Sequence, residues 1–389
     1  MSYRPPSETE AIEKQYQEME RYRYGEGPDP KPAAPAPAPT PASSYEALPK
    51  SRFNERETIA AGQDFLAMQL GQKPDHAHPL ASSISMVDLT LALGLQRRKP
   101  GGTTNDRAIM NMGMSTGDFA QMLSEAVKSV TIATYQGQAE HLAFCYPVPC
   151  KDFRPSPIPA IDSDIVLEIV GENAEVQRGT AFTAAGSAQV SLTTYAKQIA
   201  VSRLLVINDQ LSVLQQIFAQ AGANAARLES KLVADCLEQN PNLDDGNVVF
   251  STDSGNVIEA TPTTGLGAAI AALRLQTTAA GQLSDNKARH LIVSPALEME
   301  ARELIFQKNL PFLQVTVMAN LPPARWFVTA DQALCPTVGV LRLFGTKDPV
   351  RVEPRRVPFE FDGQVLQVRA DLGCCLLRRT GIIRGGTVS

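Results

Sequence analysis

Hydrophobic residues between positions 208 and 240 recur at spacings of three and four, the period of one face of an α-helix. This apolar stripe consists of Leu211, Leu214, Phe218, Ala221, Ala225, Leu228, Leu232 and Cys236. At ~1.5 Å per residue, a helix over 208–239 is roughly 45 to 50 Å long, more than a compact domain needs for its own core. We therefore predict a long helix whose larger side chains pack on an extended surface, namely Leu211, Leu214, Phe218, Leu228 and Leu232.

The same stripe repeats every seven residues through about three heptads, which is also the pattern of a coiled coil. However, Ala221 and Ala225 replace the large central side chains that stabilise a coiled coil. Asp235 stands where the next apolar residue is due, and Gly222 costs about 1 kcal/mol in helix propensity. We favour packing on a sheet of the same chain, which the small residues allow to approach closely, and keep coiled-coil pairing as the alternative.

The segment 155–204 has a period of two instead, which is typical of β-strands. The stretches DIVLEIVGE, from Asp164, and AQVSLTTYA, from Ala188, each alternate apolar and polar residues. Between them, residues 171–187 are mostly polar or small and contain glycines. The pattern predicts a long two-stranded ribbon, which is marginally stable alone and needs a neighbour to lie on.

Other helices are indicated by apolar periodicity and by capping residues. They are predicted at 86–95, 115–136 and 266–276, and after the strand in ARHLIVSPALEMEARELIF. Ser115 or Thr116 is placed to cap the second of these helices. Ser294 is placed to cap the last, with Pro295 at its first position.

The chain after Arg325 is rich in strands. Alternating stretches are WFVTADQ, VGVLRLFG, VRVEP and VPFEFDGQVLQVRADLG. The pair Asp362-Gly363, flanked by alternating apolar residues, predicts a two-residue hairpin turn.

Composition indicates a globular protein that does not grip nucleic acid. With 389 residues and 43% hydrophobic content, the chain can bury a large core. A net charge of -5 argues against a protein that binds by neutralising phosphates. No apolar run approaches the ~18 to 20 residues of a membrane span, and we expect a cytosolic protein. The six cysteines are scattered without a CxxC pair, so we expect reduced thiols.

The N-terminal region has its own composition. Residues 7–23 are charged, and PDPKPAAPAPAPTPAS then alternates proline with alanine, which predicts an extended polyproline II spacer. This segment is either a solvated tail or a tether used in assembly.

Candidate catalytic and ligand-binding groups do not converge. His76 and His78 lack further zinc ligands at a recognisable spacing. TTGLGAAIAAL has Ile270 where a phosphate-binding loop needs a third small residue, and Ser294 lacks the glycines of a nucleophile elbow. LDDG and STDSGN lack the ligand order of an EF-hand. We predict no catalytic, cofactor-binding or metal-binding residues.

Several stretches instead resemble a known family. They are STGDFAQMLSEAV, TTYAKQIAVSRLLVINDQL, GANAARLESKLVADCLEQNPNLDDGNVVFSTDSGN, WFVTAD and FEFDGQVLQVRADLG. From about residue 115 to 384, the chain resembles the major capsid proteins of tailed phages, in particular the branch often fused behind a Mu-like prohead peptidase. The resemblance implies an α+β, Hong Kong 97-like fold with a peripheral domain, an axial domain, an extended loop and an N-terminal arm. The peripheral domain of that fold carries a long spine helix on a β-sheet.

The resemblance also implies domain boundaries. They are a Pro/Ala-rich extension (1–44), the N-terminal arm and a helix (45–154), the extended loop (155–196), the peripheral domain (197–264) with its spine helix (208–239), a mostly axial segment (265–345), and strands returning to the peripheral domain (346–389).

The implied function is assembly. Such a chain forms pentamers and hexamers of an icosahedral virion shell around double-stranded DNA, without enzyme activity or cofactor. The portal, scaffold, prohead protease and any decoration proteins come from other chains. Candidate subunit contacts in the loop are Glu168, Glu172, Glu175 and Arg178.

One feature of the sequence qualifies this expectation. Some related shells join subunits through an extended-loop lysine, but none occurs between Asp152 and Ala196, so we predict a shell without crosslinks. The alternatives are an encapsulin-like nanocompartment, which packaged DNA and a portal would exclude, and a soluble enzyme, which would need a converging catalytic set.

Overall fold

A computed structural model describes residues 55–72, 74, 76–82, 84–97, 105–162, 183–208, 211–278, 281–356 and 363–386. All of them fall within the unit Asn54–Ser389. Its helices are α2 (Glu55–Gln69), α3 (Met86–Arg97), α4 (Asp106–Met114), α5 (Gly117–Gln138), η2 (Glu140–Phe144), α6 (Arg203–Ile207), α7 (Leu211–Gln239), α8 (Pro262–Leu275), η3 (Pro295–Leu297) and α9 (Glu298–Gln307).

Within the described residues, the strands form four sheets. They are β1 (Tyr146–Cys150), β2 (Ser156–Asp162), β3 (Thr183–Val190), β4 (Thr193–Ser202), β5 (Val257–Ile258), β6 (Ala288–Val293), β7 (Gln314–Val317), β8 (Trp326–Ala330), β9 (Val338–Leu343), β10 (Val350–Arg355), β11 (Gly363–Leu372), β12 (Cys374–Leu376) and β13 (Ile382–Gly385). The sheet orders are β1-β9-β12, β10-β11-β4, β5-β13-β8-β6-β7 and β2-β3. This mixture of helices with largely separate sheets confirms the predicted α+β class.

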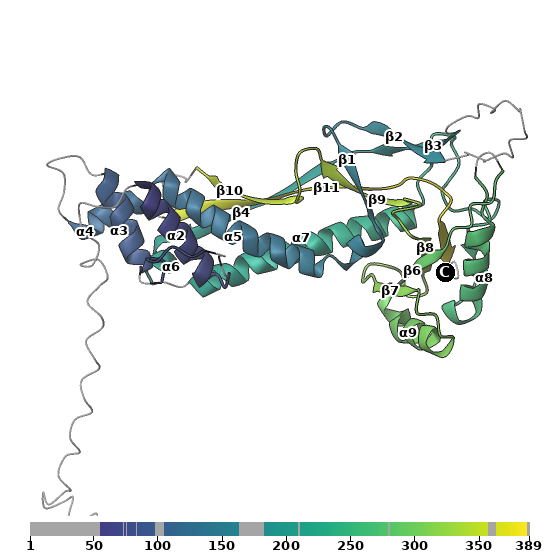
Figure 1. Cartoon of the computed structure of the whole chain (residues 1–389). Helices are drawn as coiled ribbons and strands as arrows, with labels where there is room; N and C mark the ends of the chain where they lie inside the picture. The colour runs from purple at the N-terminus through teal and green to yellow at the C-terminus, as the bar shows by residue number, and fades with distance from the viewer. Residues whose placement is uncertain are drawn as a thin grey trace, which may run out of the picture. The chain divides into compact units, whose positions relative to one another are not determined.

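The predicted long helix is present as α7, and α5 lies along it (Figure 1). The two helices approach each other closely at Gly222, where an added Cβ would stand 2.2 Å from the carbonyl oxygen of Thr131 in α5. Only glycine permits this approach, because any side chain would overlap the facing backbone. At Gly222 the close neighbour of α7 is therefore another helix, and not the sheet that the small residues at the middle of the helix were predicted to admit.

The buried face of α7 also differs from the predicted stripe beyond its first turns. Leu211, Leu214 and Phe218 are buried as predicted, but Leu228 and Leu232 are only half-buried. The side chains buried further along are those of Ala225, Ala226, Glu229, Val233, Ala234 and Leu237. A straight helix has 3.6 residues per turn, so its inner face drifts away from a seven-residue repeat, and the predicted stripe kept to the heptad.

The sheet β10-β11-β4 corrects the predicted hairpin. A turn at Asp362-Gly363 would put Arg355 opposite Ala370, but β11 places Ala370 opposite Val350 and Val365 opposite Arg355. This register keeps Val350 on the buried face with Ala370, and a shift by an odd number of residues would move a whole strand's side chains to the wrong face. Gly363 is accordingly a strand residue, and residues 357–362 lie outside the described part of the chain.

The five-stranded sheet has two buried faces. Helices α8 and α9 cover one face, where Leu266 and Leu304 meet Leu291 and other sheet residues. The other face packs Ile292 and Phe327 into a core that includes the end of α7. Strand β13 lies between β5 and β8 in this sheet.

Two capping predictions have different outcomes. Thr116 caps α5, because its Oγ1 accepts a hydrogen bond from the Phe119 N–H at 3.3 Å. Ser294 precedes η3, with Pro295 at the first helical position, but its side chain makes no capping bond. Its Oγ donates instead to the Pro323 carbonyl oxygen at 2.6 Å, so the Ser294 prediction is wrong about the role of the side chain.

The predicted ribbon is observed at its base. Strands β2 and β3 pair antiparallel from Ser156 opposite Val190 to Asp162 opposite Thr183. The predicted strand from Asp164 and the predicted tip up to residue 182 lie outside the described residues. The stretch from Ala188 is divided between β3 and β4, which begins at Thr193.

Candidate functional site

A fully buried carboxylate joins four elements of the fold. Glu229 of α7 is 0% exposed and accepts hydrogen bonds from the Tyr135 hydroxyl of α5 and from Arg342 Nη1 of β9, the latter at 2.5 Å. His141 Nε2 of η2 lies 3.0 Å from the same carboxylate. Arg342 Nη2 also donates to the Tyr135 hydroxyl oxygen at 3.1 Å, which closes the network.

The network keeps Glu229 ionised in the interior. Burial raises the pKa of Glu229, but the hydrogen bonds from His141, Arg342 and Tyr135 and the positive charge of Arg342 outweigh it and hold the pKa at about 2. Burial and the neighbouring Glu229 charge raise the pKa of Tyr135, so its hydroxyl remains a donor. A carboxylate with no solvent exposure cannot meet a substrate, so this network acts as a tie between α5, α7, η2 and β9.

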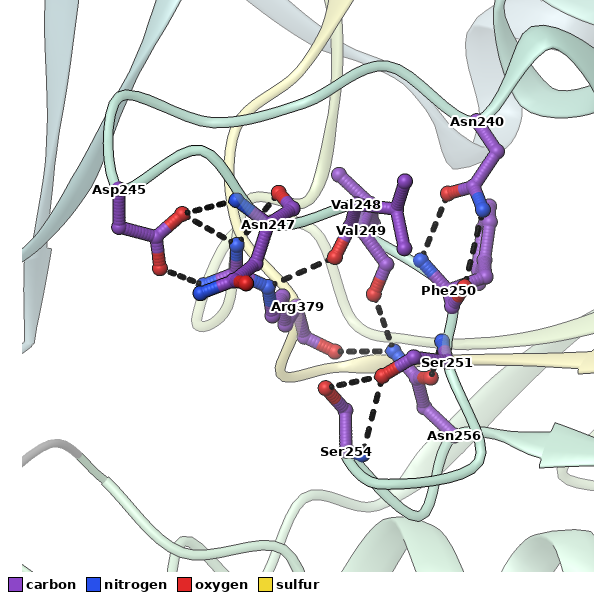
Figure 2. A network of polar contacts seen from close by, with 10 residues as sticks. All are labelled: Asn240, Asp245, Asn247, Val248, Val249, Phe250, Ser251, Ser254, Asn256 and Arg379. Atoms are coloured by element: carbon purple, nitrogen blue, oxygen red, sulfur yellow. Dashed lines mark hydrogen bonds and ion pairs between the residues drawn. The ribbon is translucent and has the colours of Figure 1, made fainter.

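A second network, shown in Figure 2, fixes the loop that follows α7. The guanidinium of Arg379 donates to both carboxylate oxygens of Asp245 at 2.6 Å, and to the carbonyl oxygens of Asn247 at 2.7 Å and Val248 at 2.9 Å. These hydrogen bonds lower the pKa of Asp245 to about 2. The acidic stretch LDDG therefore belongs to an ion pair with a distant part of the chain.

Two asparagines complete this loop (Figure 2). Asn240 ends α7 with φ 48°, and its side-chain amide both donates to the Phe250 carbonyl oxygen at 2.9 Å and accepts from the Phe250 N–H at 2.7 Å. Asn256 is fully buried; its Nδ2 donates to the carbonyl oxygens of Val249 and Arg379, and its Oδ1 accepts from the Ser251 N–H. Asparagine suits both places because its amide donates and accepts, as a backbone group does.

The predicted site residues fall into two groups. Of the proposed packing residues, Leu211, Leu214 and Phe218 lie in the interior, and Leu228 and Leu232 lie at its margin. The proposed contact residues Glu168, Glu172, Glu175 and Arg178 all lie outside the described residues.

Glu229, Arg342 and Arg379 are not among the residues predicted from the sequence. For Glu229 a signal existed, since the 3.6-residue period puts a charged residue on the buried face of α7, where it needs a partner. The partners lie far away in sequence, so spacing alone did not indicate them.

The described residues contain neither a metal-binding cluster nor a membrane-spanning helix. In this part of the chain, no group of three or more His, Cys, Asp or Glu side chains is arranged to hold a metal ion. None of the described helices combines the length and the apolar character needed to span a membrane.

Comparison with family models places the chain among viral shell proteins. The model described as phage capsid protein matches residues 186–385, just over half of the 389 residues, from β3 to β13. The chain therefore belongs to the phage capsid protein family, which confirms the resemblance found in the sequence. No curated protein matches the chain.

Solved structures also resemble the chain. They include a virus-like particle from Pyrococcus furiosus (13% identity, TM-score 0.43, covering 67% of this chain and 97% of that one). The capsid of cyanophage P-SCSP1u gives 9% identity, TM-score 0.42, and coverage of 64% and 88%. The holo-SrpI encapsulin complex from Synechococcus elongatus gives 9% identity, TM-score 0.41, and coverage of 64% and 87%. At these identities and TM-scores the likeness adds nothing to the family assignment.

Proposed function

We propose that this phage capsid protein is the major shell subunit of a tailed phage or prophage, and that its copies form the pentamers and hexamers of an icosahedral shell around double-stranded DNA. The observation that carries the proposal is the family match over 186–385. As a member of this family, the chain is a virion component. We further propose that α7 is the spine helix and that 155–196 is the extended loop.

The β2-β3 ribbon supports assembly through contacts between copies. In the part of the chain that the structure describes, these strands pair only with each other. The base of the ribbon packs on the main core through Ala188 and Val190, but a two-stranded ribbon that extends beyond such a base is marginal alone, so lying on an adjacent copy would give it further packing. The repeated, non-self-complementary contact that results is the kind that closes rings and shells.

The energy of this contact comes chiefly from apolar burial and from the number of copies. Glu168, Glu172, Glu175 and Arg178 are our candidates for polar contacts at the neighbouring copy. Exposed ion pairs contribute only about 0 to 1 kcal/mol each, so they orient the contact more than they strengthen it.

The remaining partners follow from the same proposal. Portal, scaffold, prohead protease and any decoration proteins are separate chains, and the DNA is enclosed without sequence-specific binding. Because no lysine occurs between Asp152 and Ala196, the shell holds together without isopeptide crosslinks from this loop.

A loop deletion tests the role of the ribbon. Ala188, Val190 and Leu192 belong to the main core, so the deletion must spare them. Asp162 and Thr183 are directly paired, and replacing 163–182 by Asn-Gly therefore joins β2 to β3 through a two-residue turn.

We expect the shortened chain to fold, with an unchanged circular dichroism spectrum and melting temperature, and to form no closed particles by electron microscopy. The full chain produced in parallel is the control. Normal shells from the shortened chain would refute the role of the ribbon. Nuclease-protected DNA in shells of the full chain would support a phage head, whereas enclosed protein cargo without DNA would indicate a nanocompartment.

A further inference from the structure

Two cysteines far apart in sequence meet where α7 packs against β12. Cys374, the first residue of β12, donates through its Sγ to the Leu232 carbonyl oxygen of α7 at 2.9 Å. Cys236 lies one helical turn after Leu232 on the same cavity as Cys374, and the two thiols are close enough for each to shift the pKa of the other. The hydrogen bond to Leu232 holds Cys374 of β12 against the turn of α7 that carries Cys236.

The pair is also within reach of small solutes. Both cysteines line a cavity of about 390 Å³, together with polar groups such as Asp235 and Gln239. Cys236 and Cys374 are half-buried, whereas the other cysteines of the chain are buried: Cys145, Cys150, Cys335 and Cys375. Cys236 and Cys374 are therefore both close to each other and accessible to a small solute.

We propose that Cys236 and Cys374 form an oxidation site, at which a small peroxide such as hydrogen peroxide converts the two thiols into a disulfide that joins α7 to β12. This site is independent of the shell assignment, because it depends only on the packing of the subunit itself.

The electrostatics distinguish the two sulfurs. The neighbouring Cys374 thiol lowers the pKa of Cys236 against the opposing effect of burial, whereas the neighbouring Cys236 sulfur and burial raise the pKa of Cys374. The thiolate is the form that attacks a peroxide, so Cys236 reacts first and Cys374 resolves the product.

The reaction balances in two steps. The Cys236 thiolate attacks one peroxide oxygen, the O–O bond breaks, and a sulfenic acid and hydroxide form, the hydroxide taking up a proton to give water. The Cys374 sulfur then attacks the Cys236 sulfur and displaces a second hydroxide, which takes up the Cys374 proton as water. Overall, two thiols lose two protons and two electrons to one peroxide, which gives two waters and the S–S bond.

The disulfide would act on stability. It links α7, in the middle of the chain, to β12, near the C-terminus. The crosslink therefore restricts the unfolded chain, which is the main way that disulfides stabilise proteins. A reducing cytosol keeps the thiols reduced, and an oxidising medium outside a cell favours the disulfide.

Peptide mapping of the native full chain tests the site. After brief treatment with hydrogen peroxide and alkylation of free thiols, we expect one crosslinked peptide pair containing Cys236 and Cys374, and an intact mass lower by about 2 Da. Dithiothreitol should restore both thiols. The control Cys335→Ser should retain the crosslink, because Cys335 lies elsewhere.

Single variants test the order of the two sulfurs. Cys374→Ser should leave a sulfenic acid on Cys236 that dimedone traps, and Cys236→Ser should leave Cys374 reduced. The inference is overturned if the native chain keeps all six thiols under conditions that oxidise glutathione, or if Cys236 proceeds to sulfinic acid without joining Cys374.

Discussion

Gly222 gives the sharpest test of how α7 is packed. It lies in the middle of a long helix, where alanine would raise helix propensity by about 1 kcal/mol. In this fold, however, the alanine methyl group would stand 2.2 Å from the Thr131 carbonyl oxygen and 3.2 Å from the Tyr135 backbone nitrogen. Because the obstacle is backbone, α5 must retreat by roughly 1 Å to accept Gly222→Ala.

The expected magnitude follows from two opposing terms. Overpacking of this kind costs typically about 1 to 3 kcal/mol, and the propensity gain returns about 1 kcal/mol. Retreat of α5 also loosens Tyr135 from Glu229, which adds to the cost. We expect Gly222→Ala to lower the free energy of unfolding by about 1 to 2 kcal/mol.

The matched control is Gly267→Ala in α8. Gly267 is exposed, and a methyl group there would meet nothing within 4 Å, so the same substitution should stabilise by about 0.5 to 1 kcal/mol. Urea unfolding of the unassembled chain, followed by circular dichroism, measures both. Equal stabilisation by the two substitutions would refute the close contact between α5 and α7.

Three further changes test the interior. Arg342→Leu should destabilise by about 3 to 5 kcal/mol in urea unfolding, because it leaves Glu229 buried without its cation, and a loss below 1 kcal/mol would contradict the network. Glu229 has a pKa of about 2 when folded against 4.5 as a free group, so its contribution is present above pH 4.5 and is lost as the pH falls towards 2. In Glu229→Gln, the free energy of unfolding should therefore depend less on pH between 4.5 and 2. The same pH dependence in the variant and the original chain would contradict the lowered pKa of Glu229. Leu214 is buried, so Leu214→Asp should abolish folding, and a variant that keeps a folded circular dichroism spectrum would contradict the packing of this face.

Local patterns in the sequence predicted local structure well. The spacing of apolar residues indicated α7, and Thr116 followed by a helical pattern indicated the start of α5. Periodicity of this kind is set by neighbours along the chain, so the sequence contains the information needed to read it.

The errors concern what packs against what. The partner of α7 at Gly222 is another helix, and the register of β10 with β11 follows burial rather than the Asp362-Gly363 signal. Tertiary packing selects among turns and partners that local propensity leaves open.

The same limit applies to the polar groups. Glu229 and Arg342 come together from positions that no spacing rule connects, as do Cys236 and Cys374. In each pair one residue lies on a helix and the other on a strand, and the two residues become neighbours only in the folded chain.

Sedimentation velocity of the purified full chain, combined with electron microscopy of the same sample, tests the central claim most directly. The account predicts fast-sedimenting closed particles built from pentamers and hexamers. A chain that sediments only as a folded monomer at every concentration, even with scaffold and portal proteins supplied, would contradict it.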